Sequence, residues 1–216
     1  MIDSVINSSS KLEQYFEQFR NNIVGINQYF DSPYGRKKII YADWTASGRL
    51  YTPIEEKLLS EIGPYVANTH TETSITGSAM TLAYRDARKI IKNHVNASKE
   101  DVLITVGTGM TGAINKFQRI LGLKLYENLK DYTDVPKEKR PIIFVSHMEH
   151  HSNQTSWLET IARVEVIPSN EDGLPCAIKL EELIEKHQKC PIKIAAITGC
   201  SNVTGIRTNY HEIARI

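Results

Sequence analysis

The chain has 216 residues, of which 41% are hydrophobic and 24% are charged, so its length and composition are typical of one or two globular domains with a packed core. Its 26 basic and 25 acidic residues are balanced and form no basic stripe, which argues against nucleic acids and anionic membranes as partners. No apolar run approaches transmembrane length, no signal peptide opens the chain and the three cysteines form no CxxC pair, so we expect a reduced, cytoplasmic protein.

The first hundred residues predict helices separated by polar turns. Ser10 with Glu13 fits a capping box, and apolar residues then recur at helical spacing, which predicts a helical segment within residues 1–35. The next elements expected are a strand, a polar turn, a helix, a polar loop and a helix, at 38–41, 43–48, 52–62, 68–78 and 80–95. The polar loop reads NTHTETSITGS and cannot build a core, so it is expected to be a plain loop or part of a site.

From residue 101 onward, strand patterns alternate with helix patterns. The predicted strands lie at 101–106, 141–146, 164–167 and 192–198, and the predicted helices between them lie at 113–123, 150–161 and 179–187. This alternation predicts an α/β fold with a mostly parallel, doubly wound sheet. Residues 209–216 open an amphipathic helix that has no cap and no stop signal, so we expect the chain to be a fragment.

A glycine-rich segment, GTGMTG at 107–112, follows the first of these strands. Glycines let a backbone approach a phosphate closely, and the helix that follows offers free N–H groups and the positive end of its dipole. The same letters form a GxGxxG pattern, which in dinucleotide-binding oxidoreductases is paired with an acidic residue about twenty positions on. The next predicted strand is followed first by Glu149, which is further away and lies beside two histidines. The pattern therefore favours a phosphate site of another kind, and a plain tight turn is a further alternative.

The segment 147–153 reads HMEHHSN and follows the second strand. Its spacing matches neither HExxH nor HxxEH, so we predict no metal site. A planar imidazole that stacks on a flat cofactor ring and moves protons near neutral pH is the favoured interpretation. A histidine that only caps a helix is the alternative.

The segment 198–205 reads TGCSNVTG and follows the last predicted strand. Asn202 is placed either to cap the next turn or to donate its amide to a ligand oxygen. Because ligands of open parallel sheets bind at the carboxyl ends of the strands, we expect Thr111, His150 and Asn202 to converge on one cavity.

Together these segments resemble the class V aminotransferase family, which includes the cysteine desulfurases. The similarity rests on five motifs in the family's order: YADWTAS at 41–47, YRDAR at 84–88, GMTGAIN at 109–115, EHHSN at 149–153 with Trp157, and SNVTG at 201–205. It covers nearly the whole chain from about Tyr41. It implies that residues 36–216 form an incomplete large domain of the aspartate aminotransferase-like fold.

The resemblance also implies pyridoxal 5'-phosphate as the cofactor and assigns residues to it. The phosphate would be held by the Thr111 hydroxyl and by the backbone N–H groups of Gly109, Met110 and Thr111. His150 would be the catalytic residue that stacks on the pyridine ring. Asn202 would contact the phenolic oxygen of the ring.

The resemblance further implies an amino acid as the small-molecule substrate, with Thr45 and Ala46 where its carboxylate docks, and a homodimer as the assembly. Three features depart from the family. Met110 replaces the first threonine of the family's phosphate turn, Gly112 replaces its glutamate, and residues 71–73 lack the Arg-Gly-x-His that is usual in desulfurases. The reaction therefore stays open between transamination, desulfuration and epimerisation.

Other groups that the family needs are missing from the chain. The Schiff-base lysine and the aspartate that pairs with the pyridinium both lie beyond Gly205 in the family, whereas no lysine follows Lys193 here and no aspartate follows Asp172. We therefore expect the complete protein to be an enzyme and this chain alone to be inactive. The alternatives are a dinucleotide-binding oxidoreductase module and a short, non-catalytic pseudo-enzyme that binds a phosphate or a partner.

Overall fold

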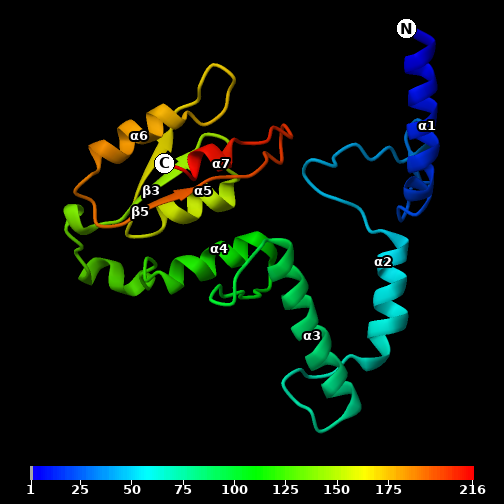
Figure 1. Cartoon of the computed structure of the whole chain (residues 1–216), viewed down its shortest axis with the longest axis horizontal. Coiled ribbons are helices and arrows are strands. Elements are labelled where there is room, and N and C mark those ends of the chain that lie inside the picture. The colour runs from blue at the N-terminus through cyan, green and yellow to red at the C-terminus, as the bar shows by residue number, and fades with distance from the viewer. Residues whose placement is uncertain (1) are drawn as a thin grey trace. The chain divides into compact units, whose positions relative to one another are not determined.

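The structure is a computed structural model that describes residues 2–216, with side chains over 11–129 and 131–216. The described chain forms two compact units, one up to Leu103 and one from Ile104 onward, and each is described by itself (Figure 1). Among the described residues, no helix is both long and apolar enough to cross a membrane.

The first unit is mainly helical. Its elements are α1 (Ile2–Asn21), β1 (Tyr29–Ser32), β2 (Gly35–Lys38), α2 (Thr52–Lys57), the single turns η1 (Leu58–Ile62) and η2 (Gly63–Tyr65), and α3 (Ile75–His94). The expected capping box at Ser10 is wrong, because Ser10 lies inside α1. No glycine or proline interrupts the chain before it, so the helix extends through this position.

The strand expected at 38–41 is displaced toward the N-terminus. Residues 29–38 form an antiparallel hairpin in which Ser32 is opposite Gly35 and Tyr29 is opposite Lys38. The Ser32 hydroxyl donates to the Gly35 carbonyl at 2.7 Å, and Gly35 has a φ of +90°, which a glycine adopts without strain. The tight turn therefore sets the register, and the ladder ends at Lys38.

Helix α3 begins earlier than the apolar pattern predicts. Ser74 caps its N-terminus by accepting a hydrogen bond from the Gly77 N–H at 3.1 Å. Near the other end, the side chains of Arg88 and Lys92 donate to the carbonyls of Leu103 and Asp101, at 2.9 and 2.8 Å.

The strand expected at 101–106 is absent. Its first carbonyls are bonded to the basic side chains of α3, and no strand in the described part of the chain forms a ladder with it. Val102 is 79% exposed and Ile104 51% exposed. A strand needs a partner, and apolar residues alone do not supply one.

Asp101 is expected to make the stability of this unit depend on pH. Its Oδ2 accepts a hydrogen bond from the Ser98 backbone N–H at 2.6 Å, and this bond, with a second from the Ser98 side chain, holds the pKa of Asp101 below its usual value. Stability from this carboxylate is therefore complete above its unfolded-state pKa and is lost as the pH falls through the lower, folded-state pKa.

We expect Asp101→Asn to unfold in urea with a small loss of stability at neutral pH and a shallower loss in acid than the wild type. The matched control is Asp86→Asn, which changes an exposed aspartate of α3. Unfolding curves measured between about pH 2 and 7 that have the same acid slope for all three proteins would contradict the assignment.

The second unit is built on a parallel sheet of three strands. The strands are β3 (Ile142–Ser146), β4 (Arg163–Ile167) and β5 (Lys193–Ala196), in the order β4-β3-β5 (Figure 1). These are three of the predicted strands, and the parallel pairing is confirmed. All five residues of β3 are buried, as expected for the centre of a sheet that is covered on both faces.

Successive residues of β3 face two separate cores. Ile142 and Phe144 pack with residues of α6 (Ala177–Lys186) and α7 (Tyr210–Ile213). Ile143 and Val145 pack with residues of α4 (Gly109–Ile120) and α5 (His151–Leu158). The helices therefore cover opposite faces of the sheet, and the predicted α/β class is confirmed. The connection from α4 to β3 carries only the short turns η3 (Glu127–Tyr132) and η4 (Lys137–Lys139).

Candidate functional site

The glycine-rich turn opens α4 in a conformation that exposes backbone donors. Thr108 and Gly109 both adopt left-handed conformations, with φ of +67° and +65°, and α4 begins at Gly109. The first N–H groups of a helix have no acceptor within it, so those of Gly109, Met110 and Thr111 point out of the helix end. A side chain at Gly112 would collide with the backbone of the turn, since a Cβ there would stand 2.3 Å from the Gly107 carbonyl oxygen. Only a glycine at position 112 leaves room for this close approach of the Gly107 carbonyl.

Two contacts show that α4 and α5 run in the same direction. The buried Gln118 donates to the Ser156 hydroxyl at 2.8 Å, and the Ile161 N–H donates to the Leu123 carbonyl at 3.0 Å. Both pairs are separated by 38 residues (156 − 118 and 161 − 123). The first contact joins the two helices, and the second joins the segments just after their C-terminal ends, so the helices run in the same direction. The starts of α4 and α5 therefore lie at the same end of the unit.

His150 is the N-cap of α5. Its Nδ1 accepts a hydrogen bond from the Ser152 N–H at 3.1 Å and lies 2.7 Å from the Ser152 hydroxyl. The side chain is exposed, the cap uses Nδ1 and not Nε2, and the ring makes an edge contact with the His151 ring, with the centroids 6.3 Å apart. The capping interpretation is therefore correct, and it is compatible with a ring that stacks on a ligand.

Asn202 lies in a turn that closes the loop after β5. The Ser201 hydroxyl accepts from the N–H groups of Val203 and Thr204, each at 3.3 Å, and the Gly205 N–H donates to the Ser201 carbonyl at 2.9 Å. The Asn202 side chain is half-buried and has no hydrogen bond to another described residue. Since β5 is parallel to β3, the turn follows the same edge of the sheet as His150.

Glu149 joins the loops that follow β3 and β5, and it was assigned no role from the sequence. The Glu149 carboxylate accepts from Ser146 at the end of β3, from Asn153 of α5 and from the Thr198 N–H after β5. The signal that points to it is the four-residue spacing of Glu149, Asn153 and Trp157, which brings a residue just before α5 to the same side as two residues within it.

Thr45 and Ala46, the predicted substrate residues, lie in the first unit. They occupy an exposed turn that is closed by the Tyr41 hydroxyl, which donates to the Ser47 carbonyl at 2.9 Å. The Tyr41 ring makes an edge contact with Trp44, with the ring centroids 5.2 Å apart. The turn is therefore a structured surface feature, and its role in binding remains a prediction.

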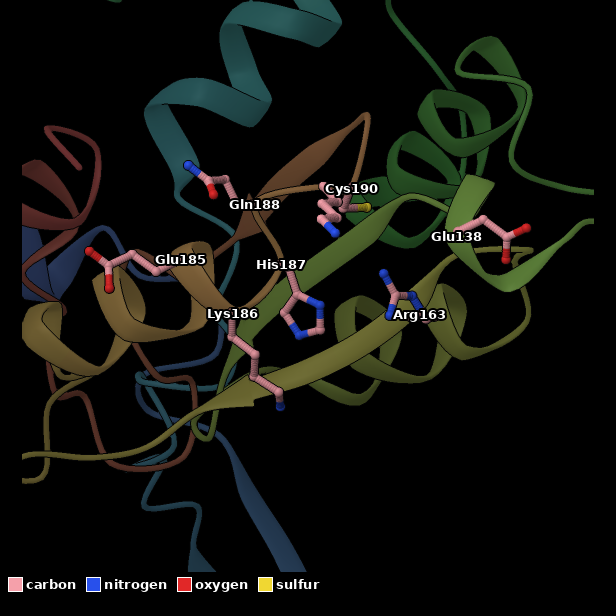
Figure 2. Close-up of a pocket in the computed structure, with 8 residues that line it drawn as sticks. Glu138, Arg163, Glu185, Lys186, His187, Gln188 and Cys190 are labelled. Carbon is pink, nitrogen blue, oxygen red and sulfur yellow. The ribbon is translucent and has the colours of Figure 1, made fainter.

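A cavity of about 450 Å³ lies at the other end of the sheet. Its lining comes from η4, the start of β4, the end of α6 and the segment between α6 and β5 (Figure 2): Glu138, Arg163, Glu185, Lys186, His187, Gln188, Lys189 and Cys190. His187 is held by Glu165, with Nε2 and the carboxylate oxygen 2.6 Å apart. The cavity is therefore at the amino ends of the strands and shares no residue with the predicted site.

The comparisons with known proteins concern the family and the fold. The aminotransferase class-V family model matches residues 40–216. The chain belongs to this family. A class-V relative named a probable cysteine desulfurase, from Halalkalibacterium halodurans, is 31% identical over 183 residues, which are 82% of this chain and 41% of that protein. A protein of the same name from Staphylococcus aureus strain COL is 27% identical over 190 residues, covering 86% of this chain and 42% of that protein.

A solved structure gives the same fold. The apo structure of a cysteine desulfurase from Thermococcus onnurineus NA1 matches with a TM-score of 0.63 and 22% identity, covering 92% of this chain and 44% of that one. The resemblance to class-V aminotransferases and the pyridoxal-phosphate-transferase fold are thereby confirmed, and pyridoxal 5'-phosphate is the cofactor of this family. The chain spans about two fifths of the length of these curated relatives.

Proposed function

We propose that the protein to which this chain belongs is a pyridoxal-phosphate-dependent enzyme that acts on an amino acid, and that this chain supplies the phosphate, ring and phenolic-oxygen contacts. The observation that carries the proposal is the parallel direction of α4 and α5. Because Gly109 begins α4 and His150 caps α5, the shared direction of the helices supports a site in which the glycine-rich turn and the histidine lie at one end of the unit.

The phosphate turn fits a dianionic group. Three backbone N–H donors and the exposed Thr111 hydroxyl lie at the positive end of the α4 dipole. The space around Gly107 and Gly109 is open, with no atom within 4 Å of a Cβ built at either position. The turn therefore offers both the charge complement and the room that a phosphate needs.

The remaining residues fit a flat, polar ring. His150 presents an exposed imidazole whose orientation is fixed by Ser152, and Asn202 presents an amide that has no described partner. The bound cofactor would supply an electron sink for bonds at the α-carbon of an amino acid. His150 would then orient the ring, and its Nε2 would hold or move a proton at the ring face.

The relatives favour cysteine as the first substrate to test, because they are named cysteine desulfurases. Thr45 and Ala46 are the proposed contacts of the substrate carboxylate.

A homodimer is proposed as well, and the exposed aromatic residues Tyr15, Phe16 and Phe19 of α1 support an association through apolar surface. The relatives give no support to a dinucleotide-binding module.

The test is cofactor binding by the full reading frame that contains this chain. We expect Thr111→Val to raise the Kd for pyridoxal phosphate roughly 10- to 150-fold, because a hydrogen bond to a charged group contributes roughly 1.5–3 kcal/mol. Binding is followed by the visible absorption of the cofactor and by quenching of tryptophan fluorescence.

Thr155→Val is the matched control, since this exposed threonine lies on α5 and its hydroxyl donates to the His151 carbonyl. A wild-type protein that does not bind the cofactor, or a Thr111→Val protein that binds it as tightly as the control, would refute the assignment.

A further inference from the structure

We infer that Glu149 is a positioning residue that fixes His150 relative to the loop after β5. Its carboxylate is occupied by protein donors from separate elements, so it does not act on the cofactor itself. The catalytic meaning of this role rests on the function proposed above. The set of hydrogen bonds from Ser146, Asn153 and Thr198 to the Glu149 carboxylate, which we call the latch, is a property of the fold.

The contacts of Glu149 join the ends of two strands. Oε1 accepts from the Ser146 hydroxyl at 2.5 Å, from the Ser146 N–H at 3.3 Å and from the Thr198 N–H at 2.8 Å. Ser146 ends β3, and Thr198 lies just after β5. Oε1 of Glu149 therefore joins two loops that are far apart in the chain, since Glu149 and Thr198 are separated by 49 residues.

The second oxygen joins this latch to the core. Oε2 accepts from Asn153 Nδ2 at 2.6 Å, and Asn153 Oδ1 in turn accepts from the Trp157 indole N–H at 3.0 Å. Trp157 is 1% exposed and packs against β3. The latch is thus anchored to a side chain that cannot move without opening the core.

His150 follows Glu149 directly, so the latch limits where its ring can lie. The chain enters α5 at His150 with the carboxylate before it bonded to both strand ends and the cap after it bonded to Ser152. The 198–205 loop that carries Asn202 is held by the same carboxylate through Thr198. Loss of the latch would therefore let the ring and the amide move independently of one another.

Both oxygens of the Glu149 side chain accept hydrogen bonds, so a neutral amide cannot take its place without losing one of them. An amide in place of Glu149 keeps one oxygen but turns the other position into a donor, which would face either Asn153 Nδ2 or the N–H of Thr198. If Asn153 turned its amide to compensate, its oxygen would leave the Trp157 indole. Glu149→Gln preserves size and shape, and so it removes the bonding pattern with little change in packing.

The experiment uses the full reading frame that contains this chain, as Glu149→Gln and as Glu159→Gln. Glu159 is the matched control, because it caps the other end of α5, is largely exposed and pairs with Lys124. Two quantities are measured: the deuterium exchange rate of the Thr198 amide, and the affinity and induced circular dichroism of bound pyridoxal phosphate.

For Glu149→Gln we expect Thr198 to exchange about tenfold faster, the cofactor Kd to rise several-fold and the circular dichroism of the bound cofactor to change, because one backbone hydrogen bond to a carboxylate is lost. Glu159→Gln should match the wild type in each. Unchanged exchange at Thr198 would overturn the latch, and weaker cofactor binding with unchanged exchange would mean that Glu149 contacts the cofactor directly. A wild type that binds no cofactor would refute the proposed function, while the exchange at Thr198 would still test the latch.

Discussion

Trp157→Ala is expected to lower the free energy of unfolding of the second unit by about 3–5 kcal/mol. The indole is 1% exposed and packs with Ile143 and Val145 of β3, so its removal opens a large cavity at the centre of one core. It also leaves Asn153 Oδ1 without the indole donor. Equilibrium unfolding in urea, followed by circular dichroism, measures the loss.

The neighbouring residue provides the control. Leu158 belongs to the same helix but is 62% exposed, so Leu158→Ala should change the free energy of unfolding by less than about 0.5 kcal/mol. A Trp157→Ala protein as stable as Leu158→Ala would show that the core is not packed as described.

Gly112→Ala is expected to cost about 1–3 kcal/mol of stability and to weaken pyridoxal phosphate binding at least tenfold in the complete protein. The added Cβ would lie 2.3 Å from both the Gly107 carbonyl oxygen and the Thr108 hydroxyl. The backbone of the turn must move to relieve this contact, and its N–H donors move with it.

Gly199→Ala is the control for the stability measurement, because a Cβ at Gly199 meets no atom within 4 Å. Thermal unfolding and cofactor titration together distinguish the two consequences of the Gly112 substitution. If Gly112→Ala melts with the wild type and binds the cofactor normally, the close approach of Gly107 and Gly112 is wrong.

The strands that were predicted correctly from the sequence are β3, β4 and β5, which pair with one another within the second unit. A continuous apolar run marks β3, and short runs bounded by turns mark β4 and β5. The segment 101–106 has an equally good strand pattern but no ladder partner among the described strands. Pattern reveals which residues suit a strand, whereas pairing depends on what lies beside them.

The site was predictable to the extent that position in a parallel sheet determines it. The loops that follow β3 and β5 are at one edge because the strands are parallel, and this much follows from the alternation of elements. The role of Glu149 was only partly predictable. Its spacing to Asn153 suggests a pair on one side of a helix, whereas the backbone N–H groups of Ser146 and Thr198 that it also binds carry no sequence signal.

The contact between Gln118 of α4 and Ser156 of α5 also bears on how the length of the connecting loop can vary. The Gln118–Ser156 contact holds α4 beside α5 directly, so the alignment of the two helices does not rest on the connection that joins α4 to β3. Lengthening a surface connection costs only about 0.6 kcal/mol for each doubling of its length. A single residue inserted within α4 before Gln118 would instead rotate the start of α4 by about 100° relative to the Gln118–Ser156 contact. The position of the glycine-rich turn relative to His150 therefore depends on helix packing and not on the length of the loop between the two helices.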